Sequence, residues 1–295
     1  MTVRVPASSA NLGPGFDALG LALALHDEVS ARLTDGPTRV TVTGEGAGEL
    51  PTDERHLVVR AMHATFEELG VPPPATALTC HNRIPQARGL GSSSAAIVAG
   101  VLLARALVAG GDERLSDADA LRVAARLEGH PDNVAACLLG GFTIAWRGAE
   151  QARAARLEPD RRVRPAVFVP AVTGLTETAR AALPATVPHP DAAHAAGRAA
   201  LLVHALTAAP DLLPEATEDR LHQRYRAPGM PATAALVDKL RAAGVAAVVS
   251  GAGPTVLALS PVPSGFDPGS EFRRWDLTVD LDGATVRAGM LEVPA

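Results

Sequence analysis

Lysine is almost absent from this sequence, and its absence excludes two common ways of binding nucleotide phosphates. Lys239 is the only lysine in 295 residues, and every other cationic side chain is arginine or histidine. A Walker-type phosphate loop requires a lysine after its glycines, and a protein kinase requires one on a strand. Lys239 lies in an amphipathic, helix-like stretch that no glycine loop precedes. Both designs are therefore excluded, as is Schiff-base chemistry except through this one residue.

Cysteine and aromatic residues are also scarce. The two cysteines, Cys80 and Cys137, lie far apart and have no CxxC or Cys/His spacing. This spacing argues against a zinc site and against a disulfide framework. We expect both cysteines to be small buried thiols in a reducing cytosol. Aromatic residues make up 3% of the chain, so the core must consist mainly of alanine, valine and leucine.

Long apolar runs and an excess of positive charge are missing as well. The N-terminal segment Met1–Val5 alternates like a strand and lacks the apolar stretch of a signal peptide. The most apolar long run, Ala95–Ala109, contains Arg105 and is too short to span a bilayer. The net charge of −5 argues against nucleic acid as a partner. We therefore expect a cytoplasmic protein that binds neither membranes nor nucleic acid.

The composition is otherwise that of a folded globular protein, with 47% apolar and 20% charged residues. A chain of this length suffices for one large domain or two ordinary ones. The spacing of apolar residues predicts an α+β fold in two lobes. The polar, arginine-rich stretch 147–164 is the best candidate for the boundary between them. We expect the lobes to comprise residues 1–155 and 156–295.

Apolar periodicity and the positions of proline and glycine predict the individual helices and strands. A turn-rich segment, 7–17, is expected between strands at 2–6 and 19–25, and a buried turn and strand at 138–145. The other strands are predicted at 39–43, 77–82, 165–172, 245–249, 255–259, 275–281 and 285–293, and helices at 57–69, 94–109, 117–127, 176–183, 191–209 and 233–243.

The strongest chemical signal is the segment Pro85–Ala95, whose sequence is PQARGLGSSSA. Gly89 and Gly91 permit a tight turn, and the serines that follow stand where a helix begins. Backbone N–H groups can then point inward as an anion nest, which the helix dipole reinforces. With so little lysine in the chain, phosphates would be held by these N–H groups and Mg²⁺, with at most Arg88 adding charge. A glycine turn before an ordinary capped helix would look similar, so the segment alone does not decide.

Two further segments combine glycine with small polar residues. Pro6–Asp17 places two serines, an asparagine and an aspartate around a Gly-Pro-Gly turn. Ser250–Thr255 is a Gly-Ala-Gly-Pro turn between two predicted strands. Each alone is an ordinary turn. Together with Pro85–Ala95, and in the same order, they resemble the three motifs of the GHMP kinases, the superfamily of galactokinase, homoserine kinase, mevalonate kinase and phosphomevalonate kinase.

Within that superfamily the string Ser8–Asp17 is similar to the homoserine kinases in particular. Further matches occur in order at Glu128–Ala135, Leu139–Gly141, Thr178–Pro184 and His222–Arg226. The resemblance therefore covers nearly the whole chain. It implies the two-lobed GHMP-kinase fold, with an N-terminal mixed α/β nucleotide-binding lobe and a C-terminal ferredoxin-like α+β lobe. It also implies Mg²⁺-dependent transfer of the ATP γ-phosphoryl group to L-homoserine, giving O-phospho-L-homoserine for threonine synthesis, and a homodimer is common in the family.

The resemblance also implies roles for single residues. Arg180 and Arg226 match the arginines that bind the substrate carboxylate, and Asp17 suits its ammonium group. Ser93 and Glu128 match the Mg²⁺ ligands and offer the hard oxygen donors that this ion prefers. The implied catalytic residues are Asp17, Asn133 and Arg180; the implied substrate pocket is Asn11, Asp17, His130, Asn133, Arg180 and Arg226; the implied ATP-phosphate site is Pro85, Gln86, Ala87, Arg88, Gly89, Leu90, Gly91, Ser92, Ser93, Ser94 and Ala95.

Two questions stay open at this point. Some relatives use an aspartate beside a lysine as general base; with one lysine in the chain, we instead hypothesise in-line transfer without a dedicated side-chain base. If Asp17 acted as the base, that hypothesis would fail. The substrate could also be a mevalonate-type or sugar alcohol, or the chain could bind nucleotide or amino acid without catalysis. The charges of Asp17, Arg180 and Arg226 favour an amino acid, and the presence of Ser93 and Glu128 favours an enzyme. His194, where the family often has asparagine, and Arg198 receive no role.

Overall fold

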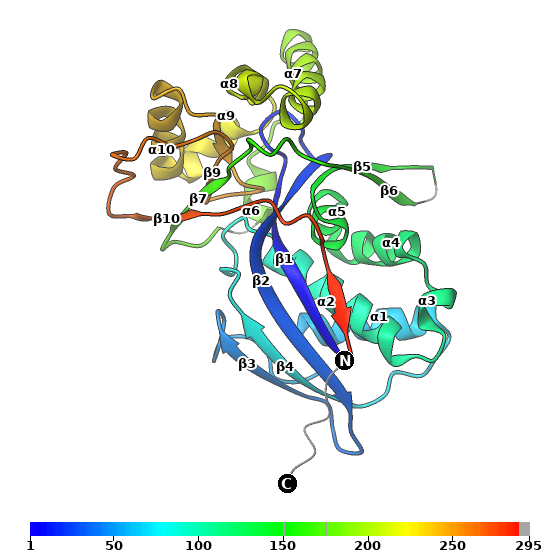
Figure 1. The fold of residues 1–295 in the computed structure, drawn as a ribbon. Helices are drawn as coiled ribbons and strands as arrows, with labels where there is room; N and C mark the ends of the chain where they lie inside the picture. The colour runs from blue at the N-terminus through cyan, green and yellow to red at the C-terminus, as the bar shows by residue number, and fades with distance from the viewer. Residues whose placement is uncertain (150, 175, 289–295) are drawn as a thin grey trace.

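The computed structural model describes residues 1–149, 151–174 and 176–288. Two sheets, each with its own set of helices, make up the molecule (Figure 1). This is the two-lobed α+β architecture that the sequence predicts.

The first sheet has seven strands, in the order β11-β1-β2-β4-β3, with β5 paired to β2 and β6 paired to β5. The long strands β1 and β2 are antiparallel, whereas β3 and β4 run parallel. Helices α1, α2, α4 and α5 cover one face of this sheet (Figure 1). The strands are β1 (Thr2–Ala10), β2 (Leu19–Leu33), β3 (Arg39–Gly44), β4 (Thr76–Asn82), β5 (Phe142–Arg147), β6 (Ala152–Leu157) and β11 (Thr285–Arg287).

Helix α2 forms the centre of the first lobe. It packs against α1, α4, α5 and β1, and its middle, Ile97–Ala104, is buried throughout. A helix can be buried on all sides only if its sequence is apolar all round, and this stretch consists of alanine, glycine, valine, leucine and isoleucine. The helices of this lobe are α1 (Leu57–Glu68), α2 (Ser92–Leu107), α3 (Gly111–Arg114), α4 (Asp117–Glu128) and α5 (Asp132–Leu139).

The second lobe has a four-stranded antiparallel sheet in the order β10-β7-β9-β8. Counted along the chain, this is the order fourth, first, third, second, which is that of a ferredoxin-like sheet. Residues 259–271, all within the described chain, form no helix between β9 and β10. The elements are β7 (Ala166–Pro170), α6 (Thr176–Ala181), α7 (His189–Thr207), α8 (Leu213–Ala216), α9 (Gln223–Arg226), α10 (Pro231–Ala242), β8 (Ala247–Val249), β9 (Val256–Ala258) and β10 (Phe272–Asp276), with short 3-10 turns at Pro210–Leu212 and Ala227–Gly229.

The end of the described chain returns to the first lobe. After β10, Asp280 accepts a hydrogen bond from His26 on β2, with 2.6 Å between the two atoms, and β11 pairs with β1. Residues 278–287 therefore belong spatially to the first sheet. The predicted division between residues 155 and 156 falls inside β6, and it stays a prediction.

Several element boundaries differ from those expected. The segment 7–17 was predicted to be turn-rich, but Ala7–Ala10 continue β1, because they pair with β2 after a bulge between Pro6 and Ala7. Helix α5 was not predicted, and it takes up residues 138 and 139 of the expected turn and strand. The strand expected at 275–281 is β10 and ends at Asp276. Of the strand expected at 285–293, residues 289–293 lie outside the described residues.

The two cysteines lie where their spacing suggests. Both Cys80 and Cys137 are buried free thiols. Burial raises the pKa of the Cys80 thiol to about 12, so this thiol is protonated and unreactive near neutral pH. In the part of the chain that the structure describes, no helix is both long and apolar enough to cross a membrane.

Candidate active site

The three glycine-containing segments that the sequence singled out meet at one place between the lobes. Ser8 donates its backbone N–H to the carbonyl of Leu90, at 3.0 Å. The Ser250 hydroxyl donates to the carbonyl of Gly89, at 2.6 Å, and also contacts the Ser9 hydroxyl, at 2.8 Å. Segments that are far apart in the chain are thus joined by direct hydrogen bonds, as a shared binding site requires.

The segment Pro85–Gly91 forms a loop that leads directly into α2. Gly91 occupies the N-cap position with a φ of 71°, and a Cβ here would collide with the Ser8 hydroxyl, so only glycine fits. Because glycine has no side chain, it cannot cap the helix, and the first N–H groups of α2 are left to a ligand. The N-terminus of this 16-residue helix is therefore suited to a phosphate group.

Arg88 lies in the same loop, but its guanidinium group is already engaged. Nε donates to the carbonyl of Pro170, Nη2 to that of Ala171 and Nη1 to that of Gln86, at 2.8 to 3.1 Å. Arg88 thus ties the loop to the end of β7 in the second lobe. Any phosphate contact at this position would come from the loop backbone rather than from the guanidinium charge.

The residues expected to bind Mg²⁺ lie side by side. The hydroxyl groups of Ser93 and Ser94 both donate to Oε1 of Glu128, at 2.6 and 2.8 Å. Within the described residues, no three His, Cys, Asp or Glu side chains gather as a metal site. One carboxylate and one hydroxyl suit Mg²⁺, which usually keeps waters and substrate phosphates among its ligands. The donor set therefore fits this ion.

Asp17 and Arg180, both expected to bind substrate, bind each other. Nη1 and Nη2 of Arg180 donate to the two carboxylate oxygens of Asp17, at 2.9 and 2.6 Å. This bidentate pair joins the first lobe to α6 of the second. Both side chains are more than one-third exposed, at 38% and 39%. The pair is therefore accessible to solvent and can exchange its partners.

Arg226 lies nearby and is almost fully buried, with 3% of its surface exposed. Its hydrogen bonds go to neutral acceptors: the carbonyl oxygens of Ala179 and Gly251 and the ring of His222. Burial, and after it the charge of Arg180, lower the pKa of Arg226. A buried cation surrounded by neutral acceptors is a strong site for an anion.

The neutral and histidine residues of the expected substrate pocket lie at the same place. Asn11 donates to the carbonyl of Gly251, at 2.9 Å, and accepts the N–H of Asp17, at 3.0 Å. The amide oxygen of Asn133 accepts the Ser8 hydroxyl, at 3.0 Å. These contacts fix the orientation of both amides.

His130 has a partner that the site prediction did not include. Its Nδ1 is 2.7 Å from the buried Asp132 carboxylate. Burial is the largest single influence and opposes the charged imidazole, but the hydrogen bond that His130 donates to Asp132 and the negative charges of Asp132 and Glu128 together outweigh it, and the pKa of His130 is raised. The only signal for Asp132 was its position inside the matched string Glu128–Ala135.

The cavity among these residues is small, about 70 Å³, compared with roughly 300–1,000 Å³ for typical ligand pockets. It is lined by all six residues of the expected substrate pocket and by Gly89, Gly91, Ser92, Ser93 and Glu128 from the expected phosphate and metal sites. The Asp17–Arg180 pair occupies part of the space that a substrate would need.

A second cavity, of about 340 Å³, opens beside it. Both cavities are lined by Ala87, Ser92 and Ser93, so they meet where the loop Pro85–Gly91 enters α2. Apolar residues from β1, β2, the segment between β3 and α1, and the starts of α1 and α2 form one part of its wall: Val5, Val29, Leu50, Pro51, Leu57, Val58, Ala95 and Ala96. An apolar cavity next to an anion site suits a nucleoside base and sugar.

Asp27 lines this second cavity and holds the backbone just before the loop Pro85–Gly91. One carboxylate oxygen accepts the N–H groups of Arg83 and Ile84, at 2.6 and 2.9 Å. Asp27 is 5% exposed, and burial raises its pKa from 3.8 to about 6. The folded state therefore holds the proton of Asp27 more tightly than the unfolded state does.

This raised pKa predicts how Asp27→Asn changes stability with pH. The contribution of Asp27 to stability is fully present below pH 4 and is lost as the pH rises through about 6. Asparagine keeps the acceptor and cannot ionise. The free energy of unfolding of the variant, taken relative to that of the wild type, should therefore rise by about 2 kcal/mol from pH 4 to pH 7. Urea unfolding at each pH measures it. The exposed Asp35→Asn is the control, and a stability difference for Asp27→Asn that does not change with pH would contradict the prediction.

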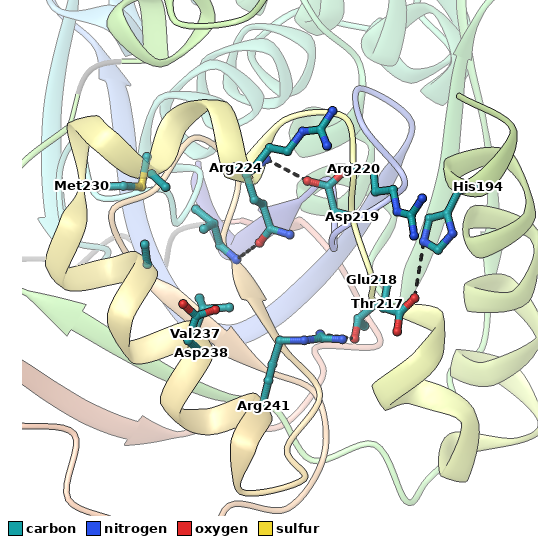
Figure 2. Close-up of a pocket in the computed structure, with 14 residues that line it drawn as sticks. His194, Thr217, Glu218, Asp219, Arg220, Arg224, Met230, Val237, Asp238 and Arg241 are labelled. Atoms are coloured by element: carbon teal, nitrogen blue, oxygen red, sulfur yellow. Dashed lines mark hydrogen bonds and ion pairs between the residues drawn. The ribbon is translucent and has the colours of Figure 1, made fainter. Parts of the chain in front are cut away.

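A third cavity, of about 520 Å³, lies in the second lobe between α7, α10 and the segment 217–227 (Figure 2). His194 and Arg198, which received no role, both contact Glu218 there, at 3.4 and 3.1 Å. The cavity shares none of its lining residues with the 70 Å³ cavity. The segment 217–227 nevertheless contributes to both, since Arg226 faces the smaller one.

Comparisons with known proteins agree with this geometry. The family model for the GHMP kinases N terminal domain matches residues 56–141, and the model for GHMP kinases C terminal matches residues 197–267. The chain is 56% identical to homoserine kinase of Streptomyces coelicolor, over 96% of this chain and 93% of that protein. It is also 56% identical to homoserine kinase of Streptomyces avermitilis, over 96% and 94%. The crystal structure of homoserine kinase from Cytophaga hutchinsonii superimposes with a TM-score of 0.83 at 27% identity, covering 97% of this chain and 96% of that one.

Proposed function

The chain belongs to the homoserine kinases of the GHMP kinase family, and from that premise we propose that it transfers the γ-phosphoryl group of ATP to the hydroxyl of L-homoserine. The observation that carries this proposal is the convergence of one anion site and two substrate-binding charges on a single cavity. The loop before α2 supplies the anion site, and Asp17 and Arg180 supply the charges. The product is O-phospho-L-homoserine.

The nucleotide occupies the 340 Å³ cavity and the loop. Its base and ribose lie against the apolar wall, and its phosphates extend along Pro85–Ala95 to the N-terminus of α2. Backbone N–H groups and the helix dipole hold these phosphates, in place of the lysine that the chain lacks there. The Ser93 hydroxyl and the Glu128 carboxylate would hold Mg²⁺, which would neutralise charge on the phosphates.

Homoserine enters by exchanging partners with the Asp17–Arg180 ion pair. Its ammonium group takes the place of Arg180 beside Asp17, and its carboxylate binds the released Arg180 and the buried Arg226. Asp17 and Arg180 thus lose each other as partners, and each gains an oppositely charged group of the substrate. The exchange also frees the space beside the cavity that the closed pair occupies.

Phosphoryl transfer then proceeds in line. The acceptor oxygen forms a bond to the γ-phosphorus while the bond to the β,γ-bridging oxygen breaks, and the hydroxyl proton leaves to a phosphoryl oxygen. Three carboxylates line the cavity, and each has a partner: Asp17 has Arg180, which the ammonium group replaces when homoserine binds, Glu128 has Ser93 and Ser94, and Asp132 has His130. This supports a reaction without a dedicated base, in which positioning and charge neutralisation provide most of the acceleration.

ADP release in the presence of different acceptors tests the proposal. Purified protein, ATP and Mg²⁺ are mixed with homoserine, serine, threonine, mevalonate or galactose. We expect homoserine to give much the fastest release, because only a charged acceptor with a hydroxyl at the right distance can exchange with the ion pair. The absence of homoserine-dependent release would refute the proposal, and ATP binding without any turnover would instead favour a non-catalytic binding protein. The homodimer and the cytoplasmic location stay predictions.

A further inference from the structure

His222 is a buried histidine to which the proposed reaction assigns no part. It is fully buried, with 0% of its surface exposed. Its Nε2 is 2.9 Å from the carbonyl oxygen of Gly13, and its Nδ1 is 3.1 Å from Nη1 of Arg226. A carbonyl only accepts and a guanidinium only donates, so the proton lies on Nε2 and the lone pair on Nδ1. The two partners thus fix one neutral tautomer.

We propose that His222 is a positioning residue that holds the Arg226 guanidinium in the orientation needed to bind the acceptor carboxylate. The imidazole ring bridges two parts of the site that are far apart in the chain: the first motif, through Gly13, and the carboxylate-binding arginine. Within the described residues, the hydrogen bonds of Arg226 use only Nε and Nη1. This leaves Nη2 for the substrate. The inference rests on the proposed function.

The surroundings of His222 keep the ring neutral and in place. Burial lowers its pKa, although Asp219 lies 3.6 Å away and acts in the opposite direction. The ring of Phe16 packs on it with centroids 5.2 Å apart, and Arg226 also lies over the face of Phe16. A protonated ring would direct an Nδ1–H group at a guanidinium, so the bridge to Arg226 requires the neutral form.

The backbone around His222 is anchored from the side of the 520 Å³ cavity. The Asp219 carboxylate, labelled in Figure 2, accepts the N–H groups of Leu221, His222 and Gln223, at 2.7 to 3.2 Å. Gly13 approaches this segment so closely that a Cβ on it would lie 2.7 Å from the carbonyl oxygen of Thr217. The ring is therefore held from both sides, as a positioning role requires.

Two substitutions separate this role from simple core packing. His222→Phe keeps an aromatic ring, somewhat larger than imidazole, but removes both nitrogen atoms. His222→Asn loses volume but keeps an oxygen close to the position of Nδ1, where it can still accept from Arg226. We expect His222→Phe to raise the KM for homoserine about tenfold or more, with the KM for ATP unchanged, and His222→Asn to raise it less. A packing role predicts the reverse order, because the phenyl ring fills the space better.

The wild type is measured first, because homoserine-dependent ADP release must be present before the variants have meaning. Its absence would refute the proposed function and not the role of His222. Thermal unfolding of each variant identifies those that fail to fold, and His63→Ala on α1 is the control. If His222→Phe binds homoserine as well as the wild type does, or His222→Asn binds it worse than His222→Phe, the inference is overturned. If His222→Phe does not fold, the two KM values of His222→Asn decide. Equal increases in the KM for homoserine and in the KM for ATP would contradict a role in positioning Arg226.

Discussion

Replacing Ser93 and Glu128 together by alanine should lower kcat by at least about 100-fold. The two side chains lie 2.6 Å apart between the phosphate loop and α4, and they are the only pair that the sequence assigned to Mg²⁺. Their loss removes charge neutralisation at the phosphates but leaves Asp17, Arg180 and Arg226 intact. Homoserine affinity, measured by calorimetry without nucleotide, should therefore change by less than about threefold.

The matched control for this pair is Ser94→Ala. Ser94 also donates to Glu128, at 2.8 Å, but nothing assigns it to the metal. Its loss removes one hydrogen bond and should lower kcat by less than about tenfold. Equal losses of kcat and homoserine affinity in the double variant would mean that Ser93 and Glu128 support the fold of the site rather than the phosphates.

The second large effect is expected for Asp17→Asn. The variant keeps the shape of the side chain and loses the charge that we propose pairs with the ammonium group of homoserine. A charged hydrogen bond contributes about 1.5–3 kcal/mol, so the KM for homoserine should rise about 10- to 100-fold. The value of kcat should change much less, because no proton transfer is assigned to Asp17.

Asp191→Asn is the control for this prediction. Asp191 is also paired with an arginine, Arg224, at 2.6 Å, but it does not line the cavity described for the substrate. Its kinetics should match those of the wild type. If instead Asp17→Asn abolished turnover and left homoserine affinity intact, Asp17 would be the general base.

The sequence predicted which segments would meet, but not how their side chains are engaged. Glycine turns beside small polar residues gave the three motifs, and the order of the motifs gave the family. The ion pair between Asp17 and Arg180 could not be predicted, because its partners are 163 residues apart and each had been assigned to the substrate. The contacts of Arg88 with carbonyl oxygens were missed for the same reason: they depend on how the lobes pack.

The fold errors have local causes. Helix α5 has eight residues and begins after Pro131, which is too short for helical periodicity to be recognised. Ser8 and Ser9 look like turn residues, yet they lie in β1 because a bulge lets them pair with β2. The return of residues 278–287 to the first sheet is made by contacts between distant parts of the chain, such as that between His26 and Asp280, for which no local pattern exists.

The most direct test of the ion-pair exchange compares homoserine with 4-hydroxybutyrate, which has the hydroxyl and the carboxylate but no ammonium group. The ratio of their kcat/KM values is measured in the wild type and in Asp17→Asn. We predict that the wild type prefers homoserine about 10- to 100-fold, which corresponds to the free energy of one charged hydrogen bond. This preference should largely disappear in the variant. An equal preference in both proteins would contradict the assignment of Asp17 to the ammonium group, and with it the exchange.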